Sequence, residues 1–455
     1  MATPEMVTRL EPANEAALAL TTTTKNYTRP LIIVTSLFFM WGFITSLNDI
    51  LVPHLKSIFD LNYSQVMLVQ LAFFSAYLLF SLPWSRVVNK IAYQRTMVIG
   101  LITMGIGAAL FVPAAAAPSF PLFLTALMIL AAGITGLQVA ANPYVIVLGK
   151  PETASSRLNL TQAFNALGTT LAPVLGGMLI LSTAPLAVEQ LRRLSPQALH
   201  LYRVQQAGSV KIPYIVISIA LILLAVAIAR FKLPKIEPAT AGLGEKVKDS
   251  IWKHPNLLLG ALGIFAYVGA EVSIGSFMVS YFGQPEIAGL SPQIAAGYVS
   301  LYWAGAMVGR FIGAGVLQRI KTSYLLGVCA VCSATLVTVS MLTSGHVAMW
   351  SMIAVGFFNS IMFPSIFALG VAELGPLTGS GSGLMNMAIV GGAIIPVIQG
   401  VIADGVGIHH AFILPVICYL YILFYARRGS TPNSERYAHC LQVVKRSMCH
   451  HAISR

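Results

Sequence analysis

Long apolar runs separated by short polar gaps are the feature that most constrains this chain. A helix needs about 20 apolar residues to cross the hydrocarbon of a membrane, where every backbone amide must be satisfied within the helix. Twelve runs have this character, at 31–51, 65–83, 97–115, 121–148, 159–181, 212–229, 257–280, 294–317, 323–343, 347–370, 382–403 and 408–426. The sequence therefore predicts an all-α polytopic membrane protein.

Charge content excludes a soluble protein. Only 9% of the 455 residues are charged, whereas soluble domains carry about 25%. The net charge of +13 would suit a nucleic-acid binder, but the basic residues lie in the gaps between apolar runs instead of forming one basic face. We therefore expect membrane lipid around the chain and no nucleic-acid partner.

The basic residues also predict the orientation of the helices. Lys and Arg resist translocation, so loops rich in them stay in the cytoplasm. With both termini cytoplasmic, 23 of the 28 Lys and Arg residues lie on the cytoplasmic side, so we expect this orientation. Arg310 is counted there, in the stretch GRFIGAGVLQRIK from Gly309. We interpret that stretch as a gating and orientation element, or as ordinary positive-inside residues, and not as a binding site.

The longest charged linker divides the chain into two sets of six runs. We expect a cytoplasmic tail at 1–30, a six-helix bundle at 31–229, a cytoplasmic linker at 230–256, a second six-helix bundle at 257–426 and a cytoplasmic tail at 427–455. Weak self-similarity links the halves, since GTTLAPVLGG from Gly168 is echoed by GGAIIPVIQG from Gly391. Paired six-helix halves are typical of transporters, whose substrate site lies at the midplane between them.

Two of the fifteen acidic residues, Asp49 and Glu271, lie within apolar runs. A carboxylate near mid-membrane costs roughly 3 kcal/mol on insertion scales, so it should face a cavity and have a partner or a proton. Burial disfavours the charged form, which makes either acid a candidate proton carrier. Asp49 alternatively lies at the membrane interface, and Glu271 alternatively is a neutral, hydrogen-bonded structural residue. We take both as candidate coupling acids.

Neutral amides in the same runs are candidate substrate ligands. Each amide offers both a donor and an acceptor, which suits an uncharged, polyhydroxylated solute. The candidates are Asn48, Gln70, Gln138, Asn142, Gln162, Asn165, Asn359 and Asn386. Any one of them could instead join two helices. Aromatic residues that could stack on a sugar ring, although most should face lipid or the interface, are Trp41, Phe43, Tyr77, Tyr267, Tyr302 and Trp303.

Other chemistry has little support in the sequence. No HExxH motif and no Ser–His pair placed for nucleophilic catalysis occur, so we do not expect an enzyme. The spacing of His439, Cys440 and Cys449 in the C-terminal tail fits no structural zinc pattern, so we expect no metal site or other cofactor. Transport driven by an ion gradient is the remaining interpretation.

Long segments of the chain resemble the fucose, glucose and galactose permeases of the major facilitator superfamily, above all the bacterial glucose/galactose branch. The segments are LFFMWGFITSLNDILVPHLK, QVAANPYVIVLGKPETASSRLNLTQAFNALGTT, YVGAEVSIGSF and FFNSIMFPSIFALG. The resemblance implies twelve helices in two pseudo-symmetric six-helix bundles and sugar uptake across the bacterial inner membrane, usually with a proton. It also implies roles in sugar binding and coupling for Asp49, and amide roles for Gln162 and Asn165.

One departure from the family concerns the coupling acid. The fucose permeases have a Glu in the segment ETAANP of the fourth span, where this sequence has Gln138, and their YVGAQ is YVGAE here, which introduces Glu271. Our hypothesis is that Glu271 is the coupling carboxylate, or that sodium replaces the proton. The sequence leaves the preferred hexose open.

These features together predict a hexose symporter, coupled to a proton or to sodium, that works by alternating access. We expect it to be a monomer in the bacterial inner membrane. A drug/proton antiporter of the same superfamily and a non-transporting sugar sensor are the alternatives. An antiporter should have a greasier cavity with fewer amides.

Overall fold

The computed structural model describes residues 27–59, 63–116, 119–180, 195–208, 210–234 and 250–431. The regular structure of these residues is helical. The predicted linker centre and both chain ends, with the Cys- and His-containing tail, lie outside the described residues. The bounds expected for the two bundles and the tails therefore stay a prediction.

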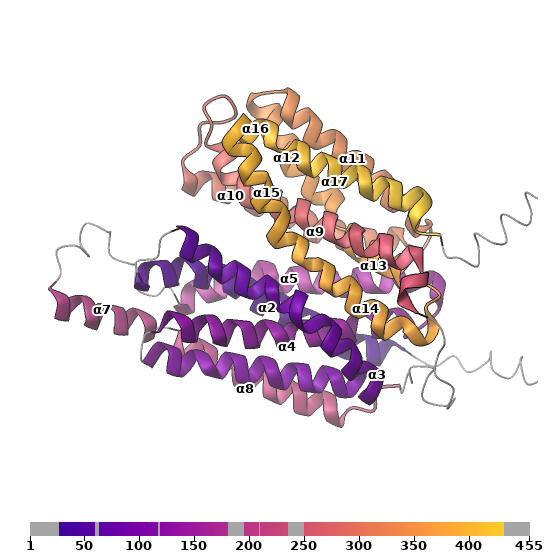
Figure 1. The fold of residues 1–455 in the computed structure, drawn as a ribbon, viewed down its shortest axis with the longest axis horizontal. Coiled ribbons are helices and arrows are strands. Elements are labelled where there is room, and N and C mark those ends of the chain that lie inside the picture. The colour runs from indigo at the N-terminus through magenta and orange to yellow at the C-terminus, as the bar shows by residue number, and fades with distance from the viewer. Residues whose placement is uncertain are drawn as a thin grey trace, which may run out of the picture.

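The N-terminal half contributes six labelled helices (Figure 1), α2 (Thr28–Phe59), α3 (Tyr63–Ala116), α4 (Phe120–Val147), α5 (Ala154–Ile180), α7 (Pro196–Gly208) and α8 (Lys211–Arg230). The C-terminal half contributes α9 (Pro255–Phe282), α10 (Pro292–Val316), α11 (Thr322–Leu342), α12 (Gly345–Asn359), α13 (Met362–Gly370), α14 (Thr378–Met387), α15 (Gly391–Val406), α16 (Ile408–Ala411) and α17 (Ile413–Phe424). Figure 1 shows these sets as two groups lying against each other, indigo to magenta and salmon to yellow.

Ten helices among the described residues are long and apolar enough to cross a membrane. One of these segments, 71–116, is long enough for two crossings. Helix α5 is not among the ten, but its 27 residues span about 40 Å, which is enough to cross. With the long segment counted twice and α5 added, the described residues contain the twelve spans that the sequence predicts.

Helix α3 is broken where the chain must turn back. Its 54 residues would be about 80 Å long if straight, whereas the hydrocarbon is about 30 Å thick. The backbone leaves the helical region at Ala92, with φ 65° and ψ 171°. On either side of the break, Trp84 donates a hydrogen bond to the carbonyl of Ala132 and Gly100 packs against Leu137. Both parts therefore lie along the same stretch of α4, and two spans result.

Three of the predicted spans consist of shorter helical pieces. The tenth is α12 followed by α13, and Pro364 lies in the first turn of the second piece. The eleventh is α14, a 3₁₀ turn at Ala388–Val390 and α15. The twelfth is α16, α17 and a π-helical turn at Tyr425–Gly429. Such breaks are tolerated within a membrane where neighbouring helices or a cavity satisfy the freed backbone groups.

The outer surface is apolar, as a lipid-facing surface should be. On α8, Ile212, Val216, Ile219 and Leu223 are exposed and follow one another along one face. Leu221, on another face of the same helix, is fully buried. A helix that is apolar on both faces is typical of a membrane span and not of a soluble domain.

Close packing of α3 on α4 yields a first prediction. A Cβ atom at Gly133 would lie 2.5 Å from the main-chain nitrogen of Met104, so Gly133→Val should destabilise the N-terminal half by about 1–3 kcal/mol. Thermal unfolding of the purified protein in detergent would measure this. Gly315→Ala is the control, because nothing lies within 4 Å of a Cβ at that position of α10. Equal melting temperatures for the two variants would contradict the prediction.

Candidate functional site

A polar cavity of about 160 Å³ lies between the two groups of helices. The N-terminal half lines it from α2, α3, α4 and α5, and the C-terminal half lines it from α9, α10, α13 and the turn at Ala388–Val390. The lining residues are Trp41, Tyr77, Gln138, Gln162, Asn165, Tyr267, Glu271, Arg310, Phe363, Pro364 and Ile389. The cavity is therefore a shared product of both halves, as a midplane transport site would be.

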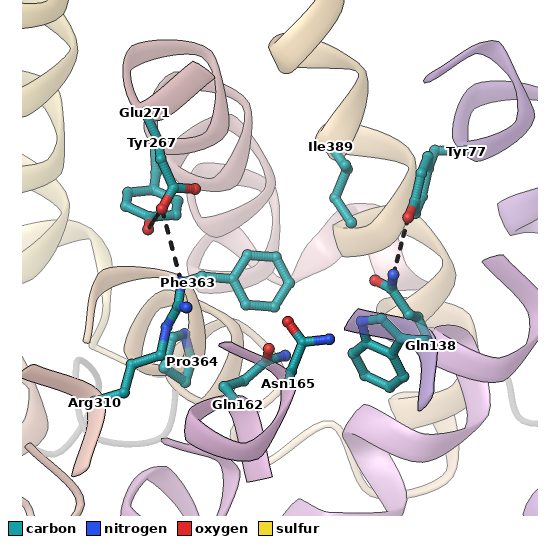
Figure 2. Close-up of a pocket in the computed structure, with 11 residues that line it drawn as sticks. Tyr77, Gln138, Gln162, Asn165, Tyr267, Glu271, Arg310, Phe363, Pro364 and Ile389 are labelled. Atoms are coloured by element: carbon teal, nitrogen blue, oxygen red, sulfur yellow. Dashed lines mark hydrogen bonds and ion pairs between the residues drawn. The ribbon is translucent and has the colours of Figure 1, made fainter. Parts of the chain in front are cut away.

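The N-terminal wall offers neutral hydrogen-bonding groups. Gln138 donates from Nε2 to the hydroxyl of Tyr77 at 2.9 Å, and Asn165 donates from Nδ2 to the carbonyl of Phe38 at 2.9 Å. Gln162 also lines the cavity and lies beside Asn165 in Figure 2. The carbonyl oxygens of these amides keep acceptor capacity for a ligand's hydroxyl groups.

The C-terminal wall carries the charged groups. Glu271 and Arg310 form an ion pair with 3.7 Å between Oε1 and a terminal guanidinium nitrogen, and each side chain is 13% exposed. Tyr267, one turn before Glu271 on α9, donates its hydroxyl to the same Oε1 at 2.7 Å. Figure 2 shows this cluster on one side of the cavity and the Gln138–Tyr77 pair on the other. Glu271 is thus partnered, as a carboxylate at membrane depth must be.

Arg310 lies in the cavity and not among the cytoplasmic loop cations. The sequence predicts that it is a gating and orientation element or an ordinary positive-inside residue, but its guanidinium lines the cavity and pairs with Glu271. The signal that could have found it is its position inside the apolar run 294–317, where an ionisable residue marks a functional site by default. Phe363, Pro364 and Ile389 also line the cavity and had no such signal.

Four of the predicted site residues, Gln138, Gln162, Asn165 and Glu271, meet in the cavity. Three others lie outside its lining: Asn142, Asn359 and Asn386 are fully buried. Asn359 donates to the hydroxyl of Tyr302 at 2.8 Å, and Asn386 donates to the carbonyl of Ser382 at 2.9 Å. Asn359 thus joins α12 to α10, which is the alternative that the sequence left open, whereas Asn386 bonds within its own helix α14.

The remaining predicted residues, Asn48, Asp49 and Gln70, belong to α2 and α3. Their side chains lie outside the part of the structure that is described. Of the aromatic candidates, Trp41, Tyr77 and Tyr267 line the cavity. Tyr302 is fully buried and Trp303 is 37% exposed, and neither is among the lining residues.

Five hydrogen bonds between the two halves lie toward one end of the molecule, and a sixth, from Thr170 Oγ1 to Met307 Sδ at 3.6 Å, lies beyond the cavity residue Asn165 on α5. Ser156 and Asn159, near the start of α5, donate to the carbonyls of Ala314 and Arg310, near the end of α10. Further pairs are Thr322 with Ser155, Asn89 with Ser380, and Ser382 with the carbonyl of Val139. We call these five bonds the closed end. The loops beside it include 148–153 and 317–321.

Comparison with known proteins identifies relatives along nearly the whole chain. The Major Facilitator Superfamily profile matches residues 33–395. A glucose/galactose transporter of Brucella abortus is 51% identical over 92% of this chain and 98% of its own. The L-fucose-proton symporter of Escherichia coli is 34% identical over 89% of this chain and 93% of its own. A crystal structure of the transporter FucP in the outward conformation superposes with a TM-score of 0.83 at 33% identity, over 89% of this chain and 99% of that one.

The ion pair yields a second prediction. Arg310→Ala leaves the Glu271 carboxylate without its cation and should lower the free energy of unfolding by about 1–3 kcal/mol. Combining Arg310→Ala with Glu271→Gln removes both charges, so part of that loss should be recovered. Thermal unfolding of wild type, both single variants and the double variant forms the cycle that measures this. A double variant no more stable than Arg310→Ala would show that the two side chains do not stabilise each other.

Proposed function

Because the chain belongs to the Major Facilitator Superfamily, we propose that it is a secondary transporter that takes up a hexose together with a proton. The family expected from the sequence motifs is confirmed, and its members named above are transporters and not enzymes. The named substrates of two relatives, glucose/galactose and L-fucose with a proton, support a hexose and a proton for this chain as well. The bacterial inner membrane and a monomeric state are part of the same proposal.

The observation that carries the proposal is the division of the cavity into a neutral wall and a charged wall. Amides of α4 and α5 face an acid, a cation and a phenol of α9 and α10. A hexose has many hydroxyl groups and no charge, so it can bind the amides while the acid exchanges a proton. This polar lining favours a sugar symporter over a drug antiporter, which should have a greasier cavity with fewer amides.

Glu271 is the group we propose for coupling. It lines the cavity in the half of the molecule opposite Gln138, the position at which the fucose permeases are expected to have their acid. Its two partners, Arg310 and Tyr267, stabilise the carboxylate, so a rearrangement that moves them away would let the acid take up a proton. Sodium in place of the proton is the alternative, and an imposed sodium gradient tests it.

The closed end supports an outward-facing state. Basic residues of the loops near it include Lys150, Arg319 and Lys321, and such residues mark the cytoplasmic side. We propose that the hydrogen bonds of the closed end seal the cytoplasmic side while the cavity communicates with the outside. The match to the outward conformation of FucP supports this assignment. Both chain termini would then be cytoplasmic.

Neutralising the acid gives the third prediction. Glu271→Gln should abolish accumulation of hexose against its gradient and preserve sugar counterflow, because exchange needs binding and alternating access but no net proton movement. Radiolabelled glucose, galactose and fucose uptake in proteoliposomes with imposed pH or sodium gradients measures both. Asp404→Asn, which removes an exposed acid of α15, is the matched control. Normal uphill accumulation by Glu271→Gln would rule out Glu271 as the coupling acid.

The amide wall gives the fourth prediction. Gln162→Ala removes a cavity side chain and should weaken hexose binding about fivefold, the equivalent of one hydrogen bond. The concentration dependence of counterflow measures this affinity. Gln284→Ala, in the loop after α9 and outside the cavity lining, should leave the affinity at the wild-type value. Equal affinities in the two variants would remove Gln162 from the sugar site.

A further inference from the structure

Asn159 joins the two halves at the closed end and was not among the predicted site residues. It is fully buried in the first turns of α5. Its Nδ2 donates to the main-chain carbonyl of Arg310, on α10 of the other half, at 2.6 Å. Its Oδ1 has no hydrogen-bond partner among the described residues. The only hydrogen bond that the Asn159 side chain makes with the described residues is therefore with the opposite half.

The residue that Asn159 holds is also the partner of Glu271. Arg310 extends its guanidinium to Glu271 at 3.7 Å, and its Nε donates to the carbonyl of Ser360 at 3.3 Å. The ion-pair distance is longer than the 2.7–2.9 Å of a close charge-assisted hydrogen bond. A small displacement of Arg310 in either direction therefore changes the electrostatic interaction with Glu271 substantially.

The Asn159–Arg310 hydrogen bond connects the contact between the two halves to the charge of Glu271 in the cavity. For the closed end to open, the start of α5 must separate from the end of α10, and the bond from Asn159 to Arg310 must break. The backbone that carries the guanidinium is then released from the N-terminal half. Because of this bond, the position of Arg310 relative to Glu271 depends on whether the two halves are in contact at the closed end.

We propose that Asn159 is a positioning residue that links the state of the closed end to the Glu271–Arg310 pair, and so helps to couple proton movement to alternating access. This inference rests on the transport function proposed above and assigns it a residue outside the cavity. Coupling requires that protonation of the acid favours one conformation of the protein, and that this conformation in turn favours protonation of the acid. Asn159 supplies a direct physical path for that mutual dependence.

A neighbouring hydrogen bond provides a matched control. Ser156, three residues before Asn159 on α5, donates its hydroxyl to the carbonyl of Ala314 at 2.6 Å. Ala314 lies on α10, four residues after Arg310. Both bonds join the same two helices and both use a main-chain carbonyl as acceptor, but only one of the acceptors belongs to the partner of Glu271. A general role in sealing the closed end would make the two bonds equivalent.

The experiment compares Asn159→Leu, Asn159→Ala and Ser156→Ala with wild type in proteoliposomes. Asn159→Leu keeps the branched shape without the donor, and Asn159→Ala checks that the result does not depend on the added apolar group. We expect both Asn159 variants to lower proton-driven hexose accumulation about fivefold, as the loss of one hydrogen bond would. Their counterflow should stay near the wild-type rate. Ser156→Ala, which removes one bond of the same seal but does not touch Arg310, should lower accumulation clearly less than either Asn159 variant.

Repeating the comparison in Glu271→Gln protein tests whether Asn159 acts through Glu271. In Glu271→Gln protein, which should accumulate no hexose but keep its counterflow, the Asn159 variants should leave the counterflow rate unchanged, since the group on which they act is already neutral. A changed counterflow rate in that background, or equal accumulation by the Asn159 and Ser156 variants, would overturn the inference while the transport function stands. A wild type that accumulates no hexose under any gradient would overturn the proposed function and this inference with it.

Discussion

The constraint on which the site depends is the cost of a charge within a membrane. Glu271 is tolerated at that depth because Arg310 and Tyr267 partner it and because it faces a polar cavity. These partners come from α9 itself and from α10, so the packing of those two helices sets the electrostatics of the site. The amides of the opposite wall need no such compensation, since a neutral group costs far less to bury when it is hydrogen-bonded. The two halves are therefore alike in fold and unlike in chemistry.

Length and hydropathy were sufficient to predict the helical spans, because the membrane leaves a backbone few alternatives. The break at Ala92 and the pieces within the last three spans were not predicted, since they depend on contacts with neighbouring helices. The site was predicted only in part. Glu271 and Gln162 were found because polar groups are rare in apolar runs, but Asn359 and Asn386 carry the same signal and bond within the protein instead. A span that is apolar on every face does not reveal which side faces a cavity.

Arg310 shows a second limit of reasoning from the sequence. A basic residue near the end of a span fits the positive-inside rule, and that rule accounts for most of the other Lys and Arg residues in this chain. The structure instead gives Arg310 three roles in one place: its backbone accepts from Asn159, its Nε donates to Ser360, and its guanidinium pairs with Glu271. Its position inside the apolar run 294–317 could have marked it as functional, but not which partners it has, because each of the three comes from a different helix or turn.

The five hydrogen bonds of the closed end all use neutral donors, namely hydroxyl and amide groups. Mobile ions screen interactions between exposed charges but have little effect on hydrogen bonds between neutral groups. The contribution of these five bonds to the balance between the two states should therefore be independent of ionic strength. This seal would stay unchanged as the salt concentration rises, whereas a seal made of exposed ion pairs would weaken.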